Sequence, residues 1–129
     1  MSVALVIVSH SAQLASGLAE LAGQMAKDVT ILPAGGTDDG RIGTSYDLVE
    51  AAVAQARAAG HDVAILSDLG SANMTIEAVL DDLSDADRDH VVFAEGPLVE
   101  GAVAAAVTSQ IGGDLPAVTE AAKARELFA

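Results

Sequence analysis

An uninterrupted apolar run at residues 3–8 constrains the fold of this chain more than any other feature. The run is rich in β-branched residues and carries no charge, which is typical of a strand that is buried on both faces of a parallel sheet. Apolar residues then recur at the spacing of a helix, at Leu14, Leu18, Leu21 and Met25. A buried strand that leads directly into a helix predicts an α/β fold.

Three more segments repeat this order of strand and helix. We expect strands at residues 29–32, 63–66 and 91–94, and helices at about 45–60, 73–83, 98–110 and 116–127. The acidic stretch at 81–89 is interpreted as a solvent-exposed turn. The sequence therefore predicts a mostly parallel sheet of four to five strands with helices on both faces, in a single domain that spans residues 1–129.

Polar residues stand at the carboxyl ends of the first and third predicted strands. Right-handed crossovers place the strand-to-helix loops at one edge of the sheet, and we expect the strand order to reverse beside the first strand and open a crevice there. His10 follows the first strand and Asp68 follows the third. A neutral imidazole can attack phosphorus with one nitrogen while a carboxylate holds the proton of the other. His10 and Asp68 are therefore the predicted catalytic pair. The alternative is that Asp68 only caps the turn that follows it.

Small and hydroxylic residues surround this pair in the three loops at the same edge. Backbone N–H groups, hydroxyl groups and helix N-termini stabilise a bound phosphoryl group. The predicted phosphoryl-binding residues are Ser9, Ser11, Gly36, Thr44, Ser45, Gly70 and Ser71. Two alternatives stay open: the glycine-rich loop at 35–45 is a flexible connection, and Ser71 is a plain helix cap. The role of Arg41, the basic residue of these loops, is not fixed by the sequence.

Composition excludes several classes of function. The chain has one Tyr, two Phe and no Trp, so it lacks the aromatic side chains on which single-stranded nucleic acid stacks. Its net charge of -13 opposes binding to the negatively charged phosphate backbone of nucleic acids. The apolar run near the N-terminus is too short to span a membrane and has no basic segment before it, which predicts a cytoplasmic protein.

We expect neither a metal nor another cofactor. The chain contains no Cys, so thiolate ligands are absent, and its three histidines lack the spacing of metal ligands. His61 and His90 precede strands in polar turns and are interpreted as exposed residues without a chemical role.

The ordered set of motifs carries a resemblance to one family of phosphotransfer proteins. The set runs over most of the chain and consists of Val8-Ser9-His10-Ser11, Ala34-Gly35-Gly36, Asp39-Gly40, Ile42-Gly43-Thr44-Ser45, Asp68-Leu69-Gly70-Ser71-Ala72 and Pro97-Leu98-Val99-Glu100-Gly101-Ala102. In these motifs the chain resembles the DhaM phosphotransfer subunits of phosphoenolpyruvate-dependent dihydroxyacetone kinases, which are similar to the mannose-type enzyme IIA domains of sugar phosphotransferase systems. Met74-Thr75 departs from the family, which tends to have Met-Asn there.

The resemblance implies a mannose-type enzyme IIA domain that works as a phosphohistidine relay. His10 would accept a phosphoryl group from the phosphocarrier protein HPr and pass it to ADP held on a separate nucleotide-binding kinase subunit. The resulting ATP would phosphorylate dihydroxyacetone on a third subunit. The chain would then be an enzyme, a phosphotransferase subunit, and the resemblance also implies a homodimer.

Three alternatives differ in the acceptor or in the chemistry. A mannose-type enzyme IIA for sugar uptake would share the fold and His10 but serve a sugar-transporting partner, whereas the motif at 68–72 and the helix start at 43–45 favour the kinase subunit. A regulator would bind a phosphocarrier without turnover. A receiver-type signalling domain would phosphorylate an aspartate after its first strand. The sequence leaves open the dimer interface, the final substrate and the phosphorylated nitrogen, with Nε2 expected if Asp68 holds the other.

Overall fold

A parallel sheet forms the centre of the protein, and the computed structural model describes residues 2–125. The strands within these residues are β1 Val3–Ser9, β2 Ile31–Gly35, β3 Asp62–Ser67 and β4 Val91–Phe93. The helices are α1 Ala12–Met25, α2 Tyr46–Ala58, α3 Ala72–Asp81, α4 Asp85–Arg88, α5 Leu98–Gln110 and α6 Leu115–Ala121.

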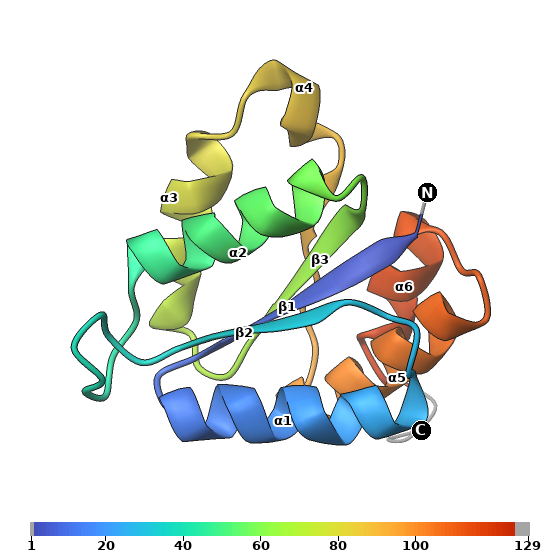
Figure 1. Ribbon diagram of the computed structural model, residues 1–129, viewed down its shortest axis with the longest axis horizontal. Helices are drawn as coiled ribbons and strands as arrows, with labels where there is room; N and C mark the ends of the chain where they lie inside the picture. Colours follow the sequence, from blue (N-terminus) through green and yellow to red (C-terminus); the bar gives the residue numbers. More distant parts are fainter. Residues whose placement is uncertain (1, 126–129) are drawn as a thin grey trace.

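The strand order in this sheet is β2-β1-β3-β4, and every neighbouring pair is parallel. The order reverses beside β1, because β2 lies on one side of it and β3 on the other. Helices α1, α5 and α6 cover one face of the sheet, and α2 and α3 cover the other (Figure 1). The predicted α/β class, the parallel sheet and the reversal beside the first strand are confirmed.

Strand β1 lies at the middle of the core and is buried along its whole length. Its alternate residues Val3, Leu5 and Ile7 pack with α1, α5 and α6. The others, Ala4, Val6 and Val8, pack with α2 and α3. Burial on both faces explains why the run carries no polar residue before Ser9.

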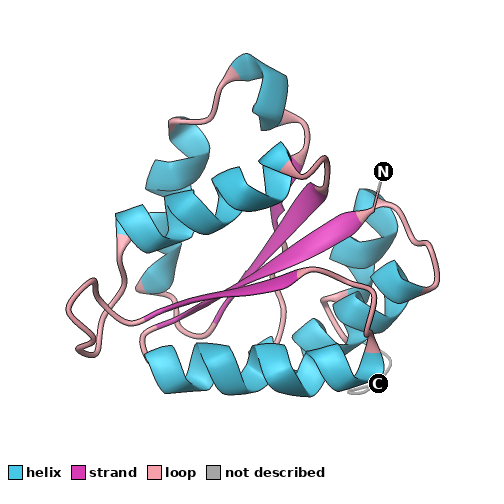
Figure 2. Cartoon of the chain, in the orientation of Figure 1, coloured by secondary structure: helices cyan, strands magenta, loops and turns pink. Residues whose placement is uncertain are grey.

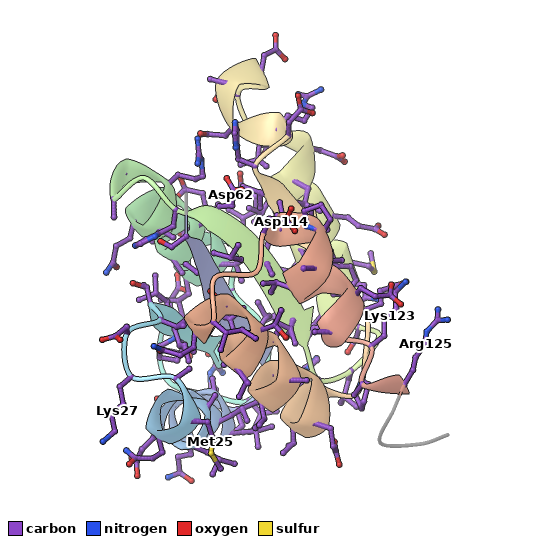
Figure 3. All side chains as sticks on the ribbon, turned by 90° about the vertical axis from the view of Figure 1, so that its right-hand side faces the viewer. Met25, Lys27, Asp62, Asp114, Lys123 and Arg125 are labelled. Atoms are coloured by element: carbon purple, nitrogen blue, oxygen red, sulfur yellow. The ribbon has the colours of Figure 1, made fainter. Side chains whose placement is uncertain are left out.

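Helix α1 packs through small side chains rather than through the leucine stripe that its sequence predicts. The buried residues of the helix are Ala15, Leu18 and Ala22. The other residues of the expected stripe are between 43% and 57% exposed, and they are Leu14, Leu21 and Met25. Figure 3 shows Met25 at the lower side of the molecule, away from the sheet. The prediction that the whole stripe is buried was wrong, because alanines let the helix lie close to its neighbours and the larger side chains then point outward.

Three element boundaries also differ from the predictions. Strand β2 begins at Ile31 and continues to Gly35, because it pairs with β1 as far as Ser9 and because an edge strand tolerates Pro33. Helix α6 ends at Ala121 instead of continuing, and its predicted end at residue 127 lies outside the described residues. The short helix α4 lies in the acidic stretch that was interpreted as a turn.

His61 and His90 are partly buried, which corrects the expectation that both are exposed. His61 Nδ1 lies 2.6 Å from the hydroxyl of Ser2, and His90 Nδ1 lies 2.8 Å from Asp62 Oδ1. Both histidines therefore hydrogen bond at the amino end of the sheet, far along the strands from His10.

Helices α5 and α6 come into close backbone contact at Gly101. A Cβ atom at this buried glycine would overlap with the carbonyl oxygen of Ala122. Gly17 in α1 offers the opposite case, because a Cβ atom there would meet no other atom within 4 Å.

We expect Gly101→Ala to lower the free energy of unfolding by about 1–3 kcal/mol, because the added methyl forces α5 and α6 apart. Gly17→Ala is the matched control and should raise it by about 0.5–1 kcal/mol, since alanine loses less backbone entropy in a helix. Urea denaturation of both variants measures these changes. A Gly101→Ala variant as stable as the parent would contradict the close contact.

Candidate active site

The point where the strand order reverses carries His10 and Asp68. Helix α1 follows β1 on one face of the sheet and α3 follows β3 on the other, so the two connecting loops diverge. Figure 2 shows the strand-to-helix loops at the left-hand end of the sheet. His10 lies in the first of these loops with its side chain 20% exposed, and Asp68 begins the second with its side chain 13% exposed. The imidazole is thus held by the protein but remains partly exposed to solvent.

The carboxylate of Asp68 accepts four hydrogen bonds. Oδ1 accepts from His10 Nδ1 at 2.9 Å and from the backbone N–H of Leu69 at 2.7 Å. Oδ2 accepts from the backbone N–H of His10 at 2.9 Å and from the Ser9 hydroxyl at 2.8 Å. Asp68 therefore does more than cap its own turn, because it fixes both the backbone and the ring of His10.

These hydrogen bonds also set the charge of Asp68. Burial raises the pKa of its carboxyl, but the hydrogen bonds from His10, Ser9 and Leu69 outweigh burial and lower the pKa below 3.8. Asp68 is consequently ionised at neutral pH and can only accept hydrogen bonds. The proton between the two side chains must then reside on Nδ1 of His10.

Ser71 contacts the other nitrogen of the same ring. Its Oγ lies 2.7 Å from His10 Nε2. In the neutral imidazole, with its proton on Nδ1, Nε2 has a free lone pair to which the Ser71 hydroxyl donates. Ser71 precedes α3, but its side chain makes no capping hydrogen bond to that helix. The hydroxyl is therefore directed at the imidazole rather than at the helix.

The predicted residues Ser9 and Ser11 shape the loop around His10. The Ser9 side chain is buried, and its Oγ also accepts the backbone N–H of Ser11 at 3.0 Å. Ser11 caps α1, since its Oγ accepts the N–H of Leu14 at 3.2 Å. Both serines fix the strand-to-helix turn, and neither side chain hydrogen bonds to the imidazole.

The glycine-rich loop holds the backbone of this turn from the opposite side. The N–H of Gly36 donates to Ser9 O at 3.0 Å, and Gly36 has a φ of 75°, which glycine adopts without strain. The N–H of Gly43 donates to His10 O at 2.9 Å. Gly43 was absent from the predicted site, although its place in a loop with several glycines was a usable signal. The loop is therefore tied to His10 and is not a free connection.

The hydroxyl groups of Thr44 and Ser45 hydrogen bond to residues other than His10. Thr44 Oγ1 pairs with Thr75 Oγ1 at 2.7 Å, and Ser45 caps α2 and also hydrogen bonds to Asp38. Arg41 is exposed and pairs with Asp39 at 2.8 Å. The structure thus brings Ser9 and Ser71 into hydrogen-bonding contact with Asp68 and His10, whereas the hydroxyl groups of Thr44 and Ser45 hydrogen bond to neighbouring elements.

Gly70 and Ser71 add unpaired backbone donors in the turn whose Ser71 hydroxyl contacts the ring. Among the described residues, their two backbone N–H groups donate to no protein acceptor. They directly precede α3, where the helix dipole also favours negative charge. An anionic group bonded to Nε2 would find the Ser71 hydroxyl nearby and these N–H groups in the same turn.

Residues 2–125 contain neither a cluster of metal ligands nor a helix of membrane-spanning character. No group of three or more His, Cys, Asp or Glu side chains in this part of the chain is arranged to hold a metal ion. None of its helices combines the length and hydrophobicity that a membrane crossing needs.

Comparison with known proteins identifies the family. The family model described as "PTS system fructose IIA component", EIIA-man, matches residues 4–119. The chain belongs to the EIIA-man family. This membership confirms the resemblance that the ordered motifs indicated.

Relatives within the EIIA-man family include several DhaM subunits. The chain is 41% identical over 106 residues to the phosphoryl donor subunit DhaM of PEP-dependent dihydroxyacetone kinase 1 from Listeria innocua, a match that covers 82% of this chain and 81% of the relative. It is 36% identical over 120 residues to the phosphotransferase subunit DhaM of a PTS-dependent dihydroxyacetone kinase from Lactococcus lactis, covering 93% of both chains. A crystal structure described as "unknown function protein EF1359" superposes with a TM-score of 0.88 at 31% identity and covers 96% of this chain and 95% of its own.

We expect Asp68→Asn to weaken the loss of stability in acid. The lowered pKa of Asp68 means that its carboxylate stabilises the folded state above the unfolded-state value of about 3.9, and that this contribution disappears as the pH falls through the lowered pKa. The free energy of unfolding of the variant should therefore fall less steeply than that of the parent between about pH 4 and pH 2.

Urea denaturation at several pH values in this range measures the slopes. Asp89→Asn, which changes an exposed carboxyl after α4, serves as the control and should keep the parental slope. Equal slopes for Asp68→Asn and the parent would refute the inference that hydrogen bonds lower the pKa of Asp68 in the folded state.

Proposed function

We propose that this chain is the phosphoryl donor subunit of a dihydroxyacetone kinase and that His10 carries the phosphoryl group. The observation that carries the proposal is the geometry of the imidazole, whose Nδ1 is held by ionised Asp68 while Nε2 contacts only the Ser71 hydroxyl on a ring that stays partly exposed. Membership of the EIIA-man family and the DhaM names of its relatives support the choice of kinase.

The first transfer forms a phosphohistidine on His10. Nε2 attacks the phosphorus of the phosphohistidine on HPr, so an N–P bond forms on His10 while the N–P bond of the carrier breaks and its imidazole leaves with the electron pair. The Ser71 hydroxyl, which donates to Nε2 at rest, has to turn toward a phosphoryl oxygen. The ring retains its Nδ1 proton and becomes cationic, and the carboxylate of Asp68 stabilises that charge.

The second transfer restores the resting imidazole. A β-phosphate oxygen of ADP, held on a separate nucleotide-binding kinase subunit, attacks phosphorus as the N–P bond to Nε2 breaks. The electron pair returns to Nε2, and the Nδ1 proton stays on the ring, so neither transfer requires a proton to leave His10. Catalysis then depends on in-line geometry and on neutralisation of the phosphoryl charge.

The remaining assignments follow from the resemblance to the DhaM subunits. ATP formed in this way would phosphorylate dihydroxyacetone on a third subunit. The chain would act in the cytoplasm as a homodimer, without nucleic acid, membrane or cofactor as a partner.

A second function is favoured by the description of the family model itself. A mannose-type enzyme IIA of a sugar phosphotransferase system would use the same His10 and the same donor but a sugar-transporting acceptor. Mixing the phosphorylated chain with the ADP-loaded kinase subunit separates the two. ATP formation supports the kinase role, and its absence together with transfer to a sugar transporter supports the alternative.

His10→Ala should abolish phosphorylation by phosphoenolpyruvate, enzyme I and HPr. His61→Gln and His90→Gln are the controls and should be labelled like the parent, because both histidines lie at the other end of the sheet. Acid-labile phosphate on the intact protein, mapped to a peptide, provides the measurement. Full labelling of the His10 variant would eliminate the proposal.

Ser71→Ala should slow phosphorylation of His10 by HPr about tenfold, the effect of one lost hydrogen bond to a charged group. Ser71→Thr retains a hydroxyl and should recover most of the rate. Rapid-quench measurement of phosphohistidine formation tests both variants. A Ser71→Ala rate equal to that of the parent would remove the hydroxyl from the mechanism.

A further inference from the structure

A hydrogen bond between two threonines links α3 to the glycine-rich loop. Thr75 Oγ1 lies 2.7 Å from Thr44 Oγ1, and either hydroxyl can donate. Both residues are partly buried, and each belongs to a segment that contacts His10. We propose that Thr75 is a positioning residue for phosphoryl transfer, which through Thr44 holds the start of α3 where Ser71 reaches the imidazole. This inference rests on the proposed function.

A closed path of contacts runs from the backbone of His10 to its ring through the two threonines. The N–H of Gly43 donates to His10 O at 2.9 Å, and Thr44 is the next residue along the chain. Ser71 has helical backbone angles (φ -65°, ψ -22°), so Thr75, one turn later, lies on the same face of α3. The Ser71 hydroxyl completes the path 2.7 Å from Nε2. The Thr44–Thr75 hydrogen bond therefore joins the loop that holds the backbone of His10 to the helix start that contacts its ring.

The Thr75 hydroxyl does not make the usual hydrogen bond of a threonine in a helix. Such hydroxyls often bond to the carbonyl oxygen one turn earlier. Thr119 of α6 does so, because its Oγ1 donates to Leu115 O at 2.7 Å. Thr75 bonds to Thr44 instead and, among residues 2–125, to no carbonyl oxygen of α3. The hydroxyl is thus used for a contact between two segments rather than within its own helix.

The start of α3 lacks the hydrogen bond that fixes the starts of α1 and α2. Ser11 and Ser45 each accept an N–H group from the first turn of the helix that they precede. Ser71 makes no such bond within the described residues, since its hydroxyl contacts Nε2 of His10. In the proposed transfer this hydroxyl turns to a phosphoryl oxygen, so it cap the helix at neither stage. Thr75 supplies a fixed point one turn further on, which leaves the Ser71 hydroxyl available to the ring.

Single-turnover phosphorylation of His10 by phospho-HPr tests the role of Thr75. Thr75→Val keeps the branched shape of the side chain and removes its hydroxyl. We expect the maximal rate constant to fall about fivefold, the size of one lost neutral hydrogen bond, while the half-saturating concentration of phospho-HPr stays within about twofold. Thr44→Val removes the same hydrogen bond from the other side and should give the same loss. Thr75→Ser retains a hydroxyl and should recover most of the rate.

Combination with Ser71→Ala separates positioning from a general loosening of the fold. If Thr75 acts through the Ser71 hydroxyl, Thr75→Val should lower the rate of the Ser71→Ala variant by less than about 1.5-fold, because the group to be positioned is already absent. A merely structural effect of Thr75 would instead multiply in full with that of Ser71→Ala.

Thr119→Val is the matched control. Thr119 is also a partly buried helical threonine with a hydroxyl hydrogen bond of 2.7 Å, but α6 covers the face of the sheet opposite to α3. This variant should leave the maximal rate constant and the half-saturating concentration unchanged.

Each other outcome is decisive. A parental rate constant in Thr75→Val would overturn the positioning role, and so would a loss that persists in full in the Ser71→Ala background. If Thr75→Val does not fold, Thr44→Val decides by the same criteria, since its side chain lies in the loop rather than in the helix. Failure of the parent to be labelled by phospho-HPr would instead overturn the proposed function of His10.

Discussion

The carboxylate of Asp68 joins the ends of the two central strands, and the arrangement of the site depends on it. Strands β1 and β3 lie side by side, but the helices that follow them run to opposite faces of the sheet. Four hydrogen bonds from three residues converge on this carboxylate across the resulting gap. The ring orientation, the tautomer and the path of the backbone at His10 are therefore set by one ionised group whose burial is compensated by its donors.

The other loops divide the remaining tasks. The glycine-rich loop fixes the backbone of residues 9 and 10 through the N–H groups of Gly36 and Gly43. The turn before α3 supplies the hydroxyl of Ser71, which contacts Nε2, and two backbone N–H groups that donate to no acceptor among the described residues. The hydrogen bonds that fix the backbone at His10 and the donors that face its ring thus come from different segments.

The sequence predicted the fold class and the His10–Asp68 pair because both follow from the apolar run of β1 and from the geometry of parallel strands. It could not predict which face of α1 is buried, since the burial of Ala15 and Ala22 in place of Leu14 and Leu21 depends on the distance to α5. The start of β2 is set by its register with β1, and local strand propensity does not predict that register. The direction of the Ser71 hydroxyl likewise depended on a tautomer that is fixed by a residue on another strand.

The two outer strands of the sheet have a consequence for the assembly of the molecule. Pro33 lies in β2 and offers no backbone N–H, and β4 is only three residues long. Such edges are poor templates for the strand of a neighbouring molecule, which protects the sheet against edge-to-edge aggregation. Contacts with other molecules are consequently left to side chains rather than to strand pairing.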